Sequence, residues 1–234
     1  MKNTNQNEVK TQTAQAFYDW AYKGRAKTIE RMLNKEDIPH NEVFLGFTTH
    51  TPAFISHGPS GLNGSIKGVG WLPKEEVMPE ILAKYKAHIA TYSPDDKTYS
   101  ERGLKILWDC LYSPEAQKHM DFSVVSSIEM AFVHSYENFL ANPDVTLLYY
   151  QPPAISFEVR GKMQVIGERH DKDAVVATED LPLLQQFVNA QHDMYHAANV
   201  ARWKTRPVYL IKIQEIYNNG LGPNGFGKKM DLIY

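Results

Sequence analysis

Hydrophobic positions along this chain recur at two different periods, and together they predict a fold that mixes helices with strands. Between residues 14 and 33, apolar side chains recur at spacings that stack on one side of a helix: Phe17, Ala21, Ile29, Met32 and Leu33. Gly24 weakens the middle of this stretch, so one kinked helix and two short helices both remain compatible with the pattern. The helical period returns between residues 74 and 120 and again between 181 and 203.

Residues 43–59 have a different character, because aromatic and β-branched side chains dominate there. We expect two short strands in this segment, with a turn at residues 49–52 between them. Residues 60–73 are rich in glycine, which predicts a mobile or ligand-hugging loop, although ordinary surface loops carry glycine too. The later part of the chain predicts further strands at 122–126, 145–150, 154–168 and 206–220, with a helix at 129–140.

The joint between the helix at 129–140 and the strand that follows has a local cause. A residue before proline is pushed out of the α region, so the helix must stop ahead of Pro143. Asn142 can close a turn with its own side chain, and Val145 then begins an alternating strand. A similar local signal at Gly161 predicts a bend within the strand at 154–168.

This order of elements lacks the strict strand–helix alternation of a parallel sheet, so we predict an α+β fold. The expected architecture is an antiparallel β-barrel of about six strands with N-terminal helices and a helical insertion at about 72–120. Residues 1–13 are polar and predict a disordered tail, and residues 14–234 are expected to form one domain.

Composition narrows the function classes. The chain has 25 basic and 27 acidic residues and a net charge of −2, which argues against a nucleic-acid partner. Its apolar runs fall short of the roughly 20 residues that span a bilayer, and its start does not resemble a secretory signal. We therefore expect a soluble, cytoplasmic protein with no membrane partner. The single cysteine, Cys110, excludes an intrachain disulfide, and its apolar surroundings predict a small buried side chain rather than a reactive thiol.

Histidines supply the first candidates for chemistry. His192 and His196 lie four positions apart on an expected helix and so share a face that could hold zinc, iron or haem, with oxygen from Asp193 or Glu179. A metal site normally takes three or more protein ligands, and no matching second cluster is visible, so we predict no metal site. A polar helix surface or a subunit interface is the favoured interpretation of this pair.

A second histidine pair, His50 and His57, would converge if the expected hairpin at 43–59 forms. Either residue could then donate a proton to a bound ligand, because histidine titrates near neutrality. Solvent-facing strand positions are the favoured interpretation for both. Trp71, at the edge of the glycine-rich segment, is expected to lie in the core or at an interface, and is the tryptophan to compare with any ligand site.

Other candidate motifs do not match the patterns that phosphate binding or catalysis requires. Residues 222–229, GPNGFGKK, are similar to a phosphate-binding loop, but Lys229 stands where a serine or threonine must meet magnesium. The chain after it is too short for the helix that would receive the phosphate. No nucleophile elbow or paired-carboxylate motif is present, so the sequence assigns no catalytic residue.

Residues 126–168 nevertheless resemble the central segment of the pyridoxamine 5′-phosphate oxidase-like FMN-binding split barrels. That family typically has a strand ending in Thr-Ser, a short helix with Asn-Leu, the motif Asn-Pro-x-Val-x-Leu, and a strand with Arg-Gly or Glu-Gly in its middle. Here Ser126-Ser127 and Asn138-Phe139 occupy the first two positions, NPDVTL the third, and FEVRGKMQVI the last. The convincing part of the resemblance covers about a third of the chain.

The resemblance implies a split barrel that binds FMN at a homodimer interface and acts as an oxidoreductase on a small-molecule substrate. It implies that Ser126, Ser127 and the helix at 134–138 meet the FMN phosphate, and that a strand at Thr48 and Thr49 holds the ring. The helix would contribute His134, Ser135 and Asn138.

One departure from the family pattern opens alternatives. Where the family usually has a lysine for the phosphate, this chain has Ser135 with His134 beside it. Phosphate favours charge-assisted donors, which Arg102, Lys105 or Lys67 could supply instead. A barrel that has lost the flavin and serves as a binding or assembly subunit is the alternative function. A haem- or metal-binding barrel using the histidine pair on the 181–203 helix is a third.

Overall fold

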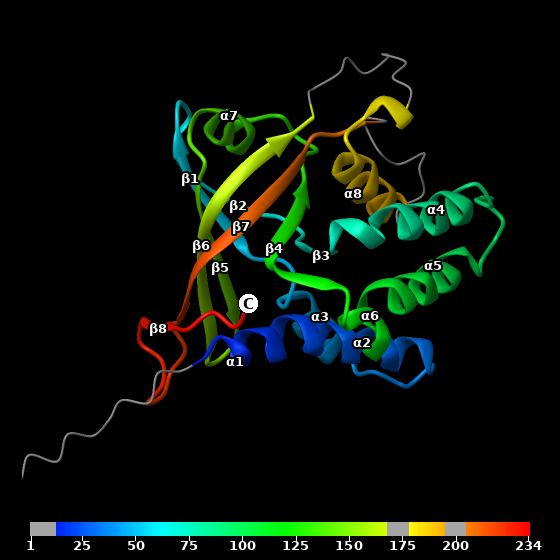
Figure 1. Ribbon diagram of the computed structural model, residues 1–234. Helices are drawn as coiled ribbons and strands as arrows, with labels where there is room; N and C mark the ends of the chain where they lie inside the picture. Colours follow the sequence, from blue (N-terminus) through cyan, green and yellow to red (C-terminus); the bar gives the residue numbers. More distant parts are fainter. Residues whose placement is uncertain (1–12, 168–177, 195–204) are drawn as a thin grey trace, which may run out of the picture.

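The computed structural model describes residues 13–167, 178–194 and 205–234, and Figure 1 shows a strongly curved sheet with helices on one side and at both ends. Within these residues the strands form one eight-stranded sheet with the order β2-β1-β5-β6-β7-β4-β3, and β8 pairs with β7. Every pairing in the sheet is antiparallel. The strands are β1 Ala53–Gly58, β2 Gly61–Ile66, β3 Gly70–Pro73, β4 Met120–Ile128, β5 Asp144–Gln151, β6 Ile155–Ile166, β7 Val208–Asn218 and β8 Lys228–Met230.

Sequence connectivity forces this sheet to curl. Its two edge strands, β2 and β3, are consecutive in the chain, and only residues 67–69 join Ile66 to Gly70. Such a connection spans at most about 14 Å, whereas the edges of a flat sheet of this strand order would lie about 29 Å apart. The sheet therefore bends until its edges approach each other, which is the α+β split barrel predicted from the sequence. Backbone hydrogen bonds hold the connection in place, from Lys67 N to Pro52 O (3.3 Å) and from Val69 N to His50 O (2.8 Å).

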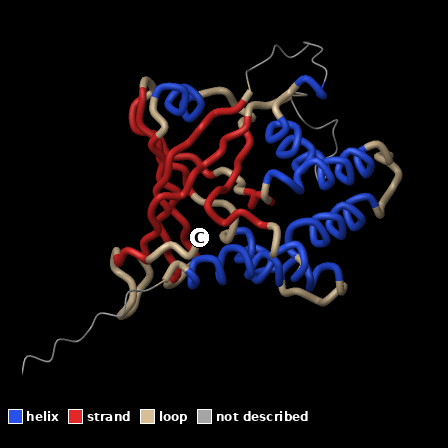
Figure 2. The backbone as a smooth tube through the Cα atoms, in the orientation of Figure 1, coloured by secondary structure: helices blue, strands red, loops and turns tan. Residues whose placement is uncertain are grey.

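The helices surround one side and the two ends of this barrel, as Figure 2 shows. Among the described residues they are α1 Gln15–Tyr18, the π-helix η1 Asp19–Lys23, α2 Gly24–Leu33, α3 His40–Phe47, η2 Glu75–Val77, α4 Met78–Ile89, α5 Tyr99–Leu107, the π-helix η3 Trp108–Tyr112, α6 Pro114–Gln117, α7 His134–Ala141, η4 Thr178–Asp180 and α8 Leu183–Asp193. Helices α4, α5 and α8 lie beside one another, while α7 covers the far end of the barrel (Figure 1). Helices α4 to α6 fall within the range expected for the helical insertion.

Several local predictions are confirmed. Helix α7 ends at Ala141, and the Asn142 side chain accepts a hydrogen bond from the Asp144 backbone N–H at 3.0 Å, which starts β5. Strand β6 shifts register between Arg160 and Gly161. A Cβ at Gly161 would lie only 2.4 Å from the backbone oxygen of Lys212, so glycine is required by this close approach.

The predicted strand over the first half of residues 43–59 is wrong, because α3 occupies His40–Phe47. Pro39 precedes the helix in an extended conformation, and its carbonyl accepts the backbone N–H groups of Glu42 and Val43, which nucleates the first turn. Thr48 and Thr49 therefore follow a helix. Only the second expected strand exists, as β1.

The predicted loop over residues 60–73 is also wrong. It contains β2, which pairs with β1 along its whole length, and β3, which pairs with β4. Gly61, with a φ of +76°, makes the tight turn between β1 and β2 that a side-chain-bearing residue would strain. The helix expected at 181–203 is described only as α8, and its later part lies outside the described residues, as do residues 1–12 of the expected tail.

The core combines the inner face of the sheet with an aromatic cluster beneath α1 and η1. Trp71 lies in this cluster with 2% of its surface exposed and contacts the rings of Phe17, Tyr22 and Phe122. It is therefore a core residue, one of the two places expected from the sequence. Cys110 is buried as well, and burial raises the pKa of its thiol, so it is a packing residue as predicted.

Candidate ligand-binding cavity

A cavity of about 340 Å³ lies where the β3–β4 edge of the barrel meets the helices. Its floor is formed by Gly68–Gly70 and Ser126–Ile128, and its walls come from α2, the end of α3, η3 and α8. This volume is at the lower end of the range for small-molecule sites. Segments far apart in the sequence thus supply one concave surface beside the part of β4 that resembles the FMN-binding proteins.

Ser126 and Ser127 of β4 both line this cavity, and both hydroxyls are engaged as donors. Ser126 Oγ donates to Gly70 O at 3.2 Å, and Ser127 Oγ donates to Gly68 O at 2.7 Å. These bonds tie the glycine-rich segment to β4. Because each hydroxyl has a single proton, both serines are left with acceptor capacity only in this arrangement.

Arg25 of α2 is the fixed positive charge at this cavity. Its side chain is half-buried and lines the same space as His50 and Tyr112. Burial, together with the nearby Arg25 charge, lowers the pKa of His50 to about 3, so this imidazole is neutral at pH 7. Burial also raises the pKa of Tyr112, while the Arg25 guanidinium, which hydrogen-bonds its phenol, opposes that rise.

Two π-helical turns place these groups. η1 ends at Lys23, immediately before α2 and two residues ahead of Arg25, and η3 ends at Tyr112. Both turns contact each other, since the rings of Tyr22 and Tyr112 stack with centroids 5.3 Å apart, and Tyr22 Oη donates to Leu111 O at 2.5 Å. Single π-turns within helices are frequently found at functional sites, and here a pair of them adjoins the cavity.

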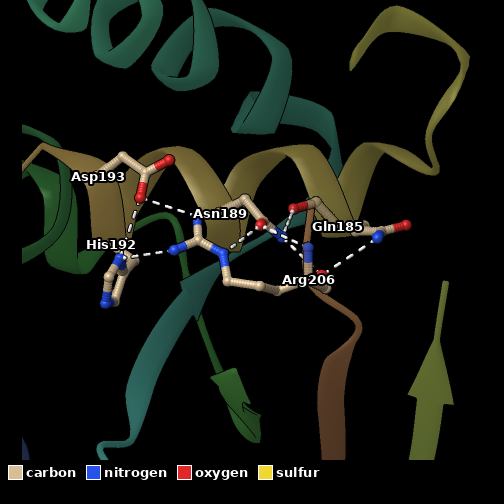
Figure 3. A network of polar contacts seen from close by, with 5 residues as sticks. All are labelled: Gln185, Asn189, His192, Asp193 and Arg206. Atoms are coloured by element: carbon tan, nitrogen blue, oxygen red, sulfur yellow. Dashed lines mark hydrogen bonds and ion pairs between the residues drawn. The ribbon is translucent and has the colours of Figure 1, made fainter. Parts of the chain in front are cut away.

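A buried arginine fixes the α8 wall, as Figure 3 shows. Arg206 is 1% exposed; its Nε donates to Asn189 Oδ1 at 2.9 Å and its Nη2 to Asp193 Oδ1 at 2.8 Å. The Asn189 amide in turn donates to the Arg206 carbonyl at 2.8 Å. His192, which lines the cavity, has its Nδ1 3.0 Å from Asp193 Oδ1 and 3.1 Å from Arg206 Nη1.

The proposed histidine pair of α8 is only partly described, because His196 lies outside the described residues. Within them, no group of three or more histidine, cysteine, aspartate or glutamate side chains could hold a metal ion. The Nδ1 of His192 faces a guanidinium, which disfavours a second cation there.

The remaining residues of the sequence-predicted site lie elsewhere. Thr48 Oγ1 and Thr49 Oγ1 donate to the carbonyls of Leu45 and Gly46 and so close the last turn of α3. Thr49 borders a separate hollow beside Trp20, not the cavity at Ser126 and Ser127.

The α7 residues form a joint with the β1–β2 hairpin. Asn138 is fully buried; its amide donates to Gly61 O at 2.8 Å, and its oxygen accepts from Ser60 N at 2.9 Å. Ser135 Oγ accepts from Asn63 Nδ2 at 2.8 Å and lies 2.9 Å from Ser65 Oγ, while His134 is exposed. Of the predicted residues, only the two serines of β4 lie together at the cavity.

The cations proposed from the sequence as substitutes for the missing lysine are each paired with a carboxylate. Lys67 Nζ lies 3.3 Å from Glu129 Oε2, Arg102 lies 2.7 Å from Asp96, and Lys105 lies 2.6 Å from Asp109. Sequence reasoning overlooked Arg25. A usable signal existed, because the α2 positions three and four residues away from it hold no acidic side chain.

The expected convergence of His50 and His57 is not found. His57 is exposed on β1, whereas His50 follows α3 and faces the cavity. The cause is the replacement of the first expected strand by a helix, which removes the hairpin that would have aligned them.

Comparison with known proteins gives likenesses in fold. No protein-family model and no curated protein matches the sequence. Among solved structures, HupZ of Group A Streptococcus is 8% identical with a TM-score of 0.39, and the match covers 80% of this chain and 97% of HupZ. A pyridoxamine 5′-phosphate oxidase candidate from Lactobacillus delbrueckii is 12% identical with a TM-score of 0.34, over 77% of this chain and 93% of that one. Another from Listeria innocua is 10% identical with a TM-score of 0.35, over 82% and 94%.

These likenesses concern the arrangement of strands and helices and carry no functional argument. Within the described ranges, no helix has both the length and the apolar character needed to cross a membrane.

Proposed function

We propose that this cavity binds FMN and that the chain is a flavin-dependent oxidoreductase acting on a small-molecule substrate. The observation that carries the proposal is the charge of the cavity: Arg25 lines it, and none of the described residues around it is an aspartate or glutamate. An anionic ligand complements such a site, whereas a cation would be repelled. The motif resemblance at β4 and β5 adds the flavin as the specific anion.

The walls suit a ring system. Leu107, Ile128 and Val188 present apolar surface, and Phe47 presents an aromatic ring. Ser126 and Ser127 can accept hydrogen bonds from the polar edge of a ring. Gln191 lines the same space near Gly70, and its amide offers both donors and an acceptor.

When bound, FMN would supply the hydride chemistry, and the protein would supply position and polarity. In this proposal the serines and Gln191 orient the ring, and the apolar walls exclude water from one side of it. The neutral His50 can accept or donate a single hydrogen bond beside the ring, without adding a second positive charge.

We also propose that the functional unit is a homodimer formed through the outward face of β2, β1 and β5. Ile66, Ala53 and Leu148 lie in register across these three strands, and Ile66 is 69% exposed. Leu62 and Tyr150 are exposed on the same strands. A contiguous apolar sheet face of this kind is typical of a protein–protein contact, and a second copy presents an identical apolar surface.

The absorption spectrum of the purified full chain tests the cofactor. The oxidised flavin bands should accompany the protein through gel filtration or appear after FMN is added and unbound FMN removed. Ser127→Glu, which places a carboxylate in the cavity, should lower the bound FMN, while Ser100→Glu on the exposed surface of α5 should not. Equal FMN content in both variants would refute the site.

A second function, a binding or assembly subunit without flavin, is favoured by one observation. Ser135, at the position of the family's usual lysine, makes its hydrogen bonds to Asn63 and Ser65 of the hairpin. These hydrogen bonds give Ser135 a structural role in joining α7 to the β1–β2 hairpin. A protein with no flavin band after reconstitution, but a normal folded spectrum, would support this second function. A Soret band would instead indicate haem.

A further inference from the structure

The proposed FMN site raises the question of which residue binds the phosphate group. A phosphate monoester needs donors, preferably charged ones, and a cation is the strongest partner. Ser126 and Ser127 have already committed their protons to backbone carbonyls. Ser135 is bonded to the hairpin. These three serines therefore do not supply the charge.

Arg25 differs from Lys23 and Arg31, which are ion-paired, and from Lys27, which has no ion pair among the described residues but is exposed to solvent. Lys23 lies 2.7 Å from Asp19, and Arg31 lies 2.7 Å from Glu42 and 2.8 Å from Glu36. Among the described residues, no carboxylate oxygen lies within ion-pair distance of Arg25, which instead faces the cavity from a half-buried position. A partly desolvated guanidinium without a counter-charge is costly to the apoprotein, and an anion in the cavity would relieve that cost.

The neighbours of Arg25 leave its charge available to a ligand. Tyr112 is buried beside it with a raised pKa, so the phenol remains protonated and does not neutralise the guanidinium. His50 is uncharged at neutral pH. Arg206, the other arginine close to this wall, is already held by Asn189 and Asp193.

Arg25 has no carboxylate partner among the described residues, and none of the described residues that line its cavity is an aspartate or glutamate. From this arrangement we infer that Arg25 binds the anionic group of the ligand and selects a phosphate monoester over its neutral alcohol. The inference rests on the proposed function for the flavin itself, and it adds the residue that supplies affinity for the phosphate. The motif resemblance suggested that the helix at 134–138 binds the phosphate, whereas Arg25 lies on another helix. Arg25 belongs to α2 and lines the same cavity as Ser126 and Ser127 of β4.

The test compares FMN with riboflavin, which has the same ring and lacks the phosphate. Flavin fluorescence is titrated with the wild-type full chain and with Arg25→Gln, Arg25→Lys and the control Lys27→Gln, an exposed position on the same helix. Wild-type protein should prefer FMN by about ten- to a hundredfold, the range for one hydrogen-bonded charge interaction. Arg25→Gln should reduce FMN affinity by a similar factor and leave riboflavin affinity unchanged. Arg25→Lys should fall between, and Lys27→Gln should match wild type.

The outcomes separate the two proposals. Flavin binding without preference for FMN, or an equal loss of both flavins in Arg25→Gln, would overturn the role of Arg25 while the flavin site stands. Failure of wild-type protein to bind either flavin would overturn the proposed function and this inference with it. If Arg25→Gln does not fold by circular dichroism, the wild-type preference and its weakening by salt still decide the question.

Discussion

The Glu129 carboxylate lies 3.3 Å from the Lys67 ammonium, and this pair joins the end of β4 to the connection between the two edges of the split barrel. Glu129 is 1% exposed and Lys67 14% exposed at their side chains. The carboxylate also accepts the Tyr209 hydroxyl of β7 and the backbone N–H groups of Ala131 and Phe132, at 2.6 and 2.7 Å. One buried charge thus fixes three segments close to the Ser126–Ile128 floor of the cavity.

Glu129→Gln should destabilise the fold by about 3 kcal/mol, because it leaves the Lys67 charge without its partner in a buried setting. Urea unfolding measures the change. Glu80→Gln, which removes the partner of Lys84 on an exposed surface, should have little effect. Similar stabilities for the two variants would contradict a structural role for the buried pair.

The stabilisation from Glu129 should depend on pH in a defined direction. Burial raises the pKa of Glu129, but Lys67, the Tyr209 hydroxyl and the backbone N–H groups together lower it below its ordinary value. A carboxyl with a depressed folded pKa stabilises the fold above its unfolded pKa and loses this effect as pH falls through the folded pKa. The stability difference between wild type and Glu129→Gln should therefore narrow below about pH 4. A difference that stays constant between pH 7 and 3 would exclude this linkage.

We expect His50 to give folding stability a second pH dependence, in a different pH range. Its folded pKa is lowered to about 3 by burial and by Arg25, so the unfolded chain takes up a proton first as pH falls. The contribution of His50 to the free energy of unfolding is therefore fully present above the unfolded pKa of about 6.5. It declines steadily as the pH falls toward 3. Wild-type stability should fall more steeply between pH 7 and 5 than that of His50→Gln. Parallel curves from urea unfolding would show that His50 is not buried in solution.

Gly68 allows a steric test of the cavity. A Cβ built there meets no heavy atom within 4 Å, and its φ is not in the left-handed region, so a side chain should be accepted by the fold and project into open space. Gly68→Leu should therefore leave the melting temperature nearly unchanged and weaken FMN binding at least about tenfold, since the bulk occupies ligand volume. Gly68→Ala is the matched control and should bind nearly as wild type. Undiminished binding by the leucine variant would place the ligand elsewhere.

The parts of this fold that could be predicted from sequence are those with a local cause. The stop before Pro143 and the bend at Gly161 each follow from the backbone of one or two residues. The α3 segment was mispredicted because its aromatic and β-branched composition favours a strand, whereas the cap at Pro39 decides the outcome. Strand propensity alone is a weak predictor where the backbone at a helix start favours a helix instead.

The cavity was less predictable from the sequence, because its binding properties depend on which charged and polar side chains have no ion-pair or hydrogen-bond partner in the folded chain. The motif includes Ser126 and Ser127, which line the cavity. It also included Asn138, whose side chain is used to hold the hairpin, and no local pattern distinguishes these two uses. For Arg25 the sequence offers one signal, the lack of an acidic residue three or four positions away on α2, but the ion pairs of Lys23 and Arg31 in the structure are needed to distinguish it from them.

The proposed homodimer predicts that charge on the outward sheet face separates the subunits. Ile66→Lys combined with Leu148→Lys places one ammonium group on β2 and one on β5, the two strands that flank β1, and a second copy brings two more against them. We expect the wild-type chain to elute as a dimer in light-scattering gel filtration and the double variant as a folded monomer. Phe44→Lys on α3, which is 69% exposed and lies off the sheet, should remain dimeric. A dimer that survives the double substitution, or a wild-type monomer, would show that this apolar face is not the subunit contact. Because the described residues that line the proposed flavin site belong to one chain, a monomeric variant that still binds FMN would separate assembly from cofactor binding.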